Sequence, residues 1–117
     1  MKIIAAVAAA LIATAPAYAV TVANSYNESL RKLSSIQQRA IMRRAVLDHQ
    51  AYCGRIGPVA YQQPYKNLEM WVVKCDKGAV YGAFVGIDGT VQVRSCADLA
   101  AFKMPACRIP KDIVPSK

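Results

Sequence analysis

Four cysteines constrain this chain more than any other feature of its sequence. Their spacings are 22, 21 and 11 positions, and none matches the Cys-x-x-Cys spacing of zinc sites or redox motifs. An even number of widely spaced cysteines in a short chain is typical of an exported domain held by disulfides. We therefore predict two disulfide bonds and no metal site among Cys53, Cys75, Cys96 and Cys107. The pair His49 and Cys53 lies at i, i+4, but no second ligand pair completes a site.

Residues 1–19 have the organisation of a secretory signal peptide. Lys2 gives a positive start, residues 3–15 are an apolar run of 13, and Ala17-Tyr18-Ala19 presents small residues two apart. The run is too short to cross a bilayer, which takes roughly 20 apolar residues. We expect cleavage after Ala19, a periplasmic or secreted location and no transmembrane segment in the mature protein. An uncleaved membrane anchor is the alternative.

The mature chain, residues 20–117, is basic and long enough for one domain. The whole chain of 117 residues has 15 Lys and Arg against 7 Asp and Glu. Removing Lys2 leaves 14 − 7 = +7 for the mature part. Hydrophobic residues make up 55%, which excludes disorder for most of the chain. A domain of about 100 residues buries only some 60–65% of its unfolded surface, so disulfides supplement a modest core.

Two candidate capping boxes begin the mature chain. Ser25 to Glu28 is one, and Ser35 to Gln38 is the other. We predict the main helix over residues 36–52 with Ser35 as its cap and Gly54 as its left-handed stop. Residues 20–34 form a polar leader or an early helix turn, residues 35–107 the folded domain, and residues 108–117 an irregular tail.

After the helix the apolar pattern changes to period two. We predict an edge strand over residues 56–61, a loop over 62–67, and strands over 68–75, 79–87 and 90–95. The Asp88-Gly89 pair indicates a hairpin, and a short helical piece follows near residues 97–102. The fold class is α+β: one long helix packed on a three- to four-stranded antiparallel meander.

The meander favours one of the three disulfide pairings that four cysteines allow. Cys75 and Cys96 end strands on either side of the middle strand, so they lie about 10 Å apart. Disulfide Cα atoms lie within about 7 Å. We therefore prefer Cys53–Cys75, which joins the helix end to the sheet, and Cys96–Cys107, which holds the tail.

The predicted helix has an apolar arc and a basic stripe. We expect the arc to face the core, and Arg44, which falls within it, to pair with Asp48; the arc is Leu33, Ile36, Ala40, Leu47 and Ala51. The basic stripe is Lys32, Arg39 and Arg43. On the sheet, Trp71 and Val73 share one face while Met70 and Val72 share the other. The second face is covered by the tail or by a partner.

No motif indicates catalysis, and no cofactor is predicted. His49 has no nucleophile beside it except Cys53, and Asp76 and Asp88 have ordinary turn roles. A non-enzymatic binding or accessory module of the bacterial envelope is therefore the leading interpretation, and a small hydrolase is the weakest alternative.

Two surfaces are candidates for binding. The basic stripe would attract an anionic envelope component or protein. Alternatively, Met70 and Val72 would make an inhibitor-like contact with a protein partner. A homodimer is a further possibility, on no assigned surface. Nucleic acid is disfavoured because basic residues do not alternate with a stacking platform of aromatics.

Four segments carry a resemblance to small exported proteobacterial proteins of unknown function with four cysteines: residues 33–46, 53–55, 65–75 and 84–96. The resemblance implies an envelope location and a disulfide-held fold, and no activity. The order of helix then hairpin is also similar to PepSY-like and cystatin-like domains, which often act as interaction or inhibitory modules. That second likeness concerns topology, and fold does not give function.

Overall fold

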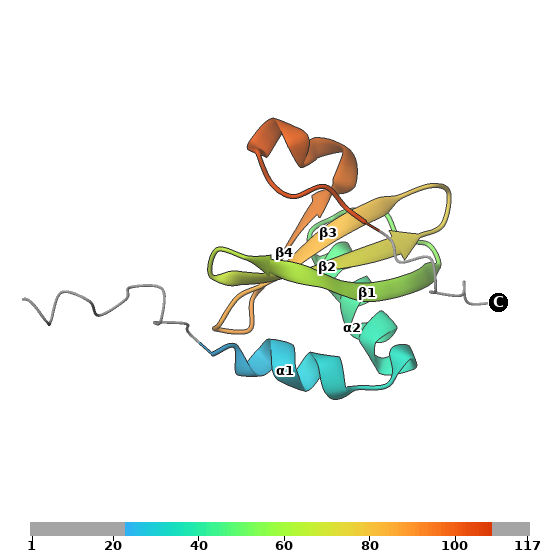
Figure 1. The fold of residues 1–117 in the computed structure, drawn as a ribbon. Coiled ribbons are helices and arrows are strands. Elements are labelled where there is room, and N and C mark those ends of the chain that lie inside the picture. Colours follow the sequence, from blue (N-terminus) through green and yellow to red (C-terminus); the bar gives the residue numbers. More distant parts are fainter. Residues whose placement is uncertain (1–22, 109–117) are drawn as a thin grey trace, which may run out of the picture.

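A computed structural model describes residues 23–108, and these form a four-stranded antiparallel sheet in the order β1-β2-β3-β4. Two helices lie on one face of the sheet and the C-terminal turns lie on the other (Figure 1). The elements are α1 (Ser25–Lys32), α2 (Ser35–Asp48), β1 (Ile56–Tyr65), β2 (Leu68–Cys75), β3 (Val80–Val85), β4 (Val91–Ser95), η3 (Cys96–Asp98) and η4 (Ala100–Phe102). The α+β class and the meander are confirmed, whereas the single long helix is wrong. The predicted signal peptide and the end of the tail lie outside the described residues.

The helical region is divided at Leu33 and Ser34. Leu33 has extended dihedrals and ends α1, and Ser34 then begins α2 with a complete capping box. The Ser34 hydroxyl accepts from the Gln37 backbone N–H at 3.2 Å, and the Gln37 side chain accepts from the Ser34 N–H at 3.1 Å. The predicted cap at Ser35 is therefore wrong by one residue. Both serines precede a glutamine by three positions, so the capping-box pattern alone fits either serine as the N-cap.

Helix α2 ends earlier than predicted, and it ends without a glycine. Gln50 takes the left-handed conformation at φ 60°. The Ala51 N–H donates to the Val46 carbonyl at 3.1 Å, and the Gln50 N–H donates to the Leu47 carbonyl at 2.9 Å. These two bonds make a Schellman motif, which satisfies the last carbonyls of the helix. Gly54 lies beyond that motif and does not stop the helix.

Strand β1 is longer than predicted and occupies an edge of the sheet. It continues through residues 62–65, which the sequence assigned to a loop, and it contains Pro58 and Pro64. Its pairing with β2 shifts register between Ile56 and Val59 and between Tyr61 and Gln63. An edge strand tolerates proline because one of its sides has no ladder partner.

The other strands match their predicted positions closely. Strand β2 has the predicted bounds, and β3 and β4 form the predicted hairpin at Asp88-Gly89. Gly89 has φ 88°, and the Tyr26 ring of α1 lies against it so closely that a Cβ would be 2.9 Å from the ring edge. Glycine is therefore required here both by the turn and by the helix that packs on it.

The main core lies between the helices and one face of the sheet. Met42 and Val46 of α2 pack there against Trp71 and Val73 of β2, and all four are at most 1% exposed. Asn27 of α1 is also buried, and its Oδ1 accepts a hydrogen bond from Trp71 Nε1 at 2.6 Å. This bond fixes α1 to the sheet through the only tryptophan of the chain.

The C-terminal segment covers the second face of the sheet. Leu99, between η3 and η4, is fully buried against Met70 and Phe84. Gly82 makes room for this contact, because a Cβ there would be 3.1 Å from the Phe84 ring and 3.3 Å from Leu99. The tail covers this face, as one of the two predicted alternatives stated. The predicted helical piece over residues 97–102 is two 3-10 turns.

Both preferred disulfides are present. Cys53 bonds to Cys75 with the Cα atoms 5.2 Å apart, and Cys96 bonds to Cys107 with the Cα atoms 5.8 Å apart. The first joins the end of the helical region to β2, and the second holds the tail near β4. The tail then reaches β1, where the Gln62 side chain donates to the Ala106 carbonyl and accepts from the Arg108 backbone N–H.

Candidate functional site

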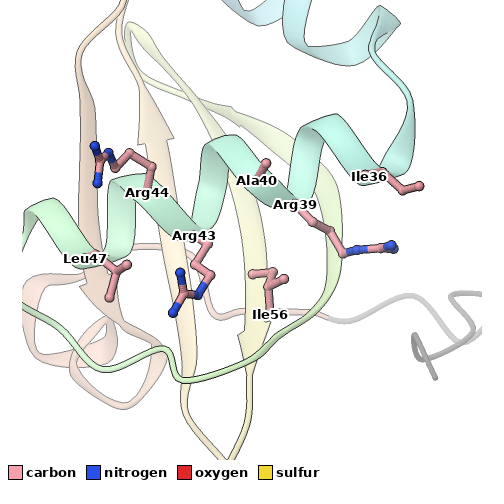
Figure 2. A pocket seen from close by; sticks show the side chains of 7 residues that line it. All are labelled: Ile36, Arg39, Ala40, Arg43, Arg44, Leu47 and Ile56. Carbon is pink, nitrogen blue, oxygen red and sulfur yellow. The ribbon is translucent and has the colours of Figure 1, made fainter.

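An open groove lies beside α2. Its volume is about 570 Å³, and Figure 2 shows the side chains along it. The groove is lined by Ile36, Arg39, Ala40, Arg43, Arg44, Leu47 and Ile56. A volume of a few hundred Å³ is in the range of ligand pockets. The lining combines apolar side chains with three arginines, so it suits a ligand that is both apolar and anionic.

This groove contains most of the apolar arc that the sequence placed in the core. Ile36 is 69% exposed and Leu47 is 36% exposed, and Ala40 is also exposed. Met42 and Val46 are the α2 residues that are fully buried, and at 100° per residue their mean direction lies about 120° from the centre of the exposed arc. The predicted core face is therefore right only at its ends, where Leu33 and Ala51 pack against the core. Its middle is exposed because α2 is apolar on two sides, and contact with the sheet buries the side that carries Met42 and Val46.

Two arginines of the predicted basic stripe lie in the groove. Arg39 and Arg43 are half-buried and extend from α2 toward the side on which Ile56 lies (Figure 2). Arg43 Nε donates to the Cys53 carbonyl at 3.0 Å, and its Nη2 donates to the Gly54 carbonyl at 3.5 Å. Arg43 is thus held in place by the segment after the helix, and its other N–H groups remain for a ligand.

Lys32 does not join these arginines. It ends α1, which is separated from α2 by the break at Leu33 and Ser34, and it does not line the groove. Lys32 was grouped with Arg39 on the assumption that both residues lie on one continuous helix. The structure therefore brings together two of the three stripe residues.

The second predicted binding surface is not accessible. Met70 is 0% exposed and Val72 is 3% exposed, because the segment that includes Leu99 packs over this face. A partner cannot reach Met70 or Val72 unless that segment leaves, so both residues belong to a core. This removes the inhibitor-like contact through the apolar sheet face.

The charges around the groove are mostly positive. Arg44 and Asp48 form the predicted i, i+4 pair at 4.0 Å, and both side chains are well exposed. It is the only ion pair within 4.0 Å among residues 23–108. Arg39 and Arg43 have no carboxylate partner in that part of the chain. An exposed pair at this distance contributes little to stability, so Asp48 neutralises Arg44 only partly.

The acidic groups with altered pKa values lie in turns. The Arg55 backbone N–H and the Tyr52 hydroxyl both donate to Asp76 at 2.8 Å and lower the pKa of that carboxyl. The same bond raises the pKa of Tyr52. The Thr90 hydroxyl and backbone N–H lower the pKa of Asp88. These contacts stabilise charged carboxylates in turns, the role the sequence indicated.

The remaining polar cluster connects α1 to the sheet. Tyr61 donates to Glu69 at 2.6 Å, and burial followed by this hydrogen bond raises the pKa of Tyr61 to about 12. The Arg31 guanidinium lies 4.4 Å from the centre of the Tyr61 ring, and Trp71 meets the ring edge-on at 5.8 Å.

His49 Nδ1 lies 2.9 Å from the Ala45 carbonyl oxygen on its own helix. Within residues 23–108 no three His, Cys, Asp or Glu side chains are placed to hold a metal ion.

Arg44 and Ile56 are groove residues that the sequence analysis did not assign to a site. Arg44 was considered only as a partner for Asp48, and Ile56 only as the start of a strand. The available signal was the spacing of Ile36, Ala40, Arg43 and Leu47 at intervals of 4, 3 and 4, which repeats along one helix face.

Comparisons with protein-family models, with curated proteins and with solved structures find no match to this chain. Among the residues that the structure describes, no helix combines the length and apolar character needed to cross a membrane. The two disulfides are of the kind that persist in oxidising compartments, which is compatible with a place outside the cytoplasm.

Proposed function

We propose that this chain is an exported, non-enzymatic binding module that captures an anionic partner with apolar groups in the groove beside α2. The observation that carries the proposal is the exposure of Ile36 and Leu47 between Arg39, Arg43 and Arg44. Exposed apolar side chains gathered on one face and rimmed by charged residues are a feature of interaction sites. The leading sequence hypothesis is retained, with its site moved from a basic stripe to this mixed groove.

Two further observations support the proposal. The signal-peptide pattern of residues 1–19 and the two disulfides favour export, and the mature charge of 14 − 7 = +7 favours an anionic partner. Asp76 and Asp88 accept hydrogen bonds that stabilise turns, and His49 contacts a carbonyl of its own helix, so a structural role accounts for all three.

Quantitative capture from envelope extract tests this function. The full chain, produced by export and immobilised, is compared with Ile36→Ser/Leu47→Ser and with the control Lys66→Gln/Lys103→Gln, whose two lysines are exposed and lie outside the groove. We expect the groove variant to lose the captured partner and the control to keep it, with capture weaker at high salt. Equal capture by all three proteins would refute the groove as the binding site.

A further inference from the structure

The exposed strip on α2 has the spacing of a helix-docking seam. Ile36, Ala40, Arg43 and Leu47 are separated by 4, 3 and 4 residues, so they lie within about 60° of one another at 100° per residue. This alternation of three and four is the pattern by which one helix packs along another. The strip runs from Ile36 to Leu47, a rise of 11 residue steps or about 16 Å at 1.5 Å per residue, which is roughly three helical turns.

The charges along the seam are arranged on both of its sides. Arg39 lies on the side toward Ile56, and Arg44 lies on the opposite side of the helix (Figure 2). In paired helices, the residues that flank the apolar seam select the partner by charge. Two flanking arginines therefore select a partner helix with carboxylates on both flanks.

Arg43 occupies the middle of the seam, where an apolar residue would be usual. Its guanidinium is fixed by the Cys53 carbonyl, and its aliphatic part lies along the groove between Ala40 and Leu47. A polar group at one seam position sets the register of paired helices at some cost in affinity. A partner carboxylate opposite Arg43 would define the register.

We propose, resting on the function proposed above, that the occupant of the groove is an acidic amphipathic helix of another protein. The helix carries apolar side chains at alternating spacings of three and four and Glu or Asp on both flanks. It binds in the helix-in-groove mode, with Ile36 and Leu47 as apolar contacts and Arg39 and Arg44 as the charges that select it.

A second copy of this chain fits the groove less well. The only carboxylate on α2 is Asp48, which pairs with Arg44 of its own helix. Two copies joined through this face would place arginines against arginines. A flat lipid surface also fits less well, because the side chains line a groove between α2 and Ile56, and the fixed Arg43 interrupts the apolar strip at its middle.

The test uses a synthetic helix and the full chain. The probe is a fluorescein-labelled peptide of about 18 residues, since shorter isolated helices are marginal in water. It has Leu at the seam positions, Glu at the flanking positions, and Ala or Gln elsewhere. A second peptide has Lys in place of each Glu. We expect the Glu peptide to bind at least ten-fold more tightly than the Lys peptide, and more weakly as salt rises.

Four proteins are compared in this assay by fluorescence anisotropy, with thermal melting as a check of folding. Arg39→Gln/Arg44→Gln should weaken binding by about four- to twenty-five-fold, since each exposed ion pair contributes a factor of roughly two to five. Ile36→Ser/Leu47→Ser should weaken it by more than about ten-fold through lost apolar burial. The control Lys66→Gln/Lys103→Gln removes two charges elsewhere and should bind like the wild type.

The remaining outcomes separate this proposal from the proposed function. If neither peptide binds but vesicles of anionic phospholipid bind and the groove variants abolish that binding, the helical partner is refuted and the groove function stands. If ultracentrifugation shows a dimer that Ile36→Ser/Leu47→Ser dissociates, the occupant is a second copy. If no probe binds and extract capture is also insensitive to the groove, both proposals fail.

Discussion

The hydrogen bond between Asn27 and Trp71 predicts a measurable loss of stability when its acceptor is removed. In Asn27→Ala, Trp71 Nε1 would be left without its 2.6 Å partner at a position that is 1% exposed. An unsatisfied buried donor costs about 1–3 kcal/mol. Alanine favours the helix over asparagine by roughly 0.5 kcal/mol, which offsets part of this cost. We expect the free energy of unfolding to fall by about 0.5–2.5 kcal/mol.

Urea denaturation followed by far-ultraviolet circular dichroism measures this change. The matched control is Ser29→Ala, an exposed position on the same helix, which should change stability by about 0.5 kcal/mol or less. Since a domain of this size shifts its Tm by about 4–8 °C per kcal/mol, thermal melting gives a second measurement. If Asn27→Ala proves as stable as Ser29→Ala, the bond does not hold α1 on the sheet and the account of this core is wrong.

Three further predictions concern titration and the tail. The pKa of Tyr61 is raised from 10.0 to about 12, so its neutral form contributes stability that is fully present below pH 10 and is lost as the pH rises toward 12. The wild type should show a tyrosinate absorbance step near pH 12 that is absent in Tyr61→Phe. Because the pKa of Asp76 is lowered, its charged form contributes stability that is present above pH 3.8 and is lost on acidification. The stability difference between wild type and Asp76→Asn should therefore shrink below that pH, and Asp98→Asn is the charge-matched control. Cys96→Ser/Cys107→Ser opens a loop of 11 residues, which should cost about 3 kcal/mol and raise the binding of a hydrophobic dye by the uncovered sheet face; unchanged dye binding would show that the tail holds its place without the bond.

The sheet and the disulfides were predictable from the sequence because local signals there agree. Strand β2 is bounded by the turns at Lys66-Asn67 and Lys77-Gly78 and alternates between two apolar faces, so its position and its two faces follow from period two. The distance across the meander then excludes Cys75–Cys96, and the preferred one of the two remaining pairings is the one present. These features depend on residues that are close in the sequence, and alternative tertiary packings do not change them.

The helices were predicted less well because their signals conflict. Ser34 and Ser35 each precede a glutamine by three positions, so the start of α2 and the break after α1 could not be assigned from a capping pattern. Helix α2 has apolar residues on two sides, and only contact with the sheet decides that Met42 is buried and Ile36 is exposed. The candidate groove was missed for the same reason, because its apolar residues were assigned to the core.

The two disulfides join cysteines that are consecutive along the chain, so neither closed loop encloses or interleaves with the other. Cys53 meets Cys75 before Cys96 is reached in the order of synthesis, and Cys96 then meets Cys107. An oxidant that pairs cysteines as they emerge, first with second and third with fourth, makes the native bonds directly. Both alternative pairings require Cys53 to remain reduced until a later cysteine arrives. The arrangement of cysteines therefore makes the vectorial order of oxidation and the native connectivity the same, so oxidation in that order would require no disulfide rearrangement.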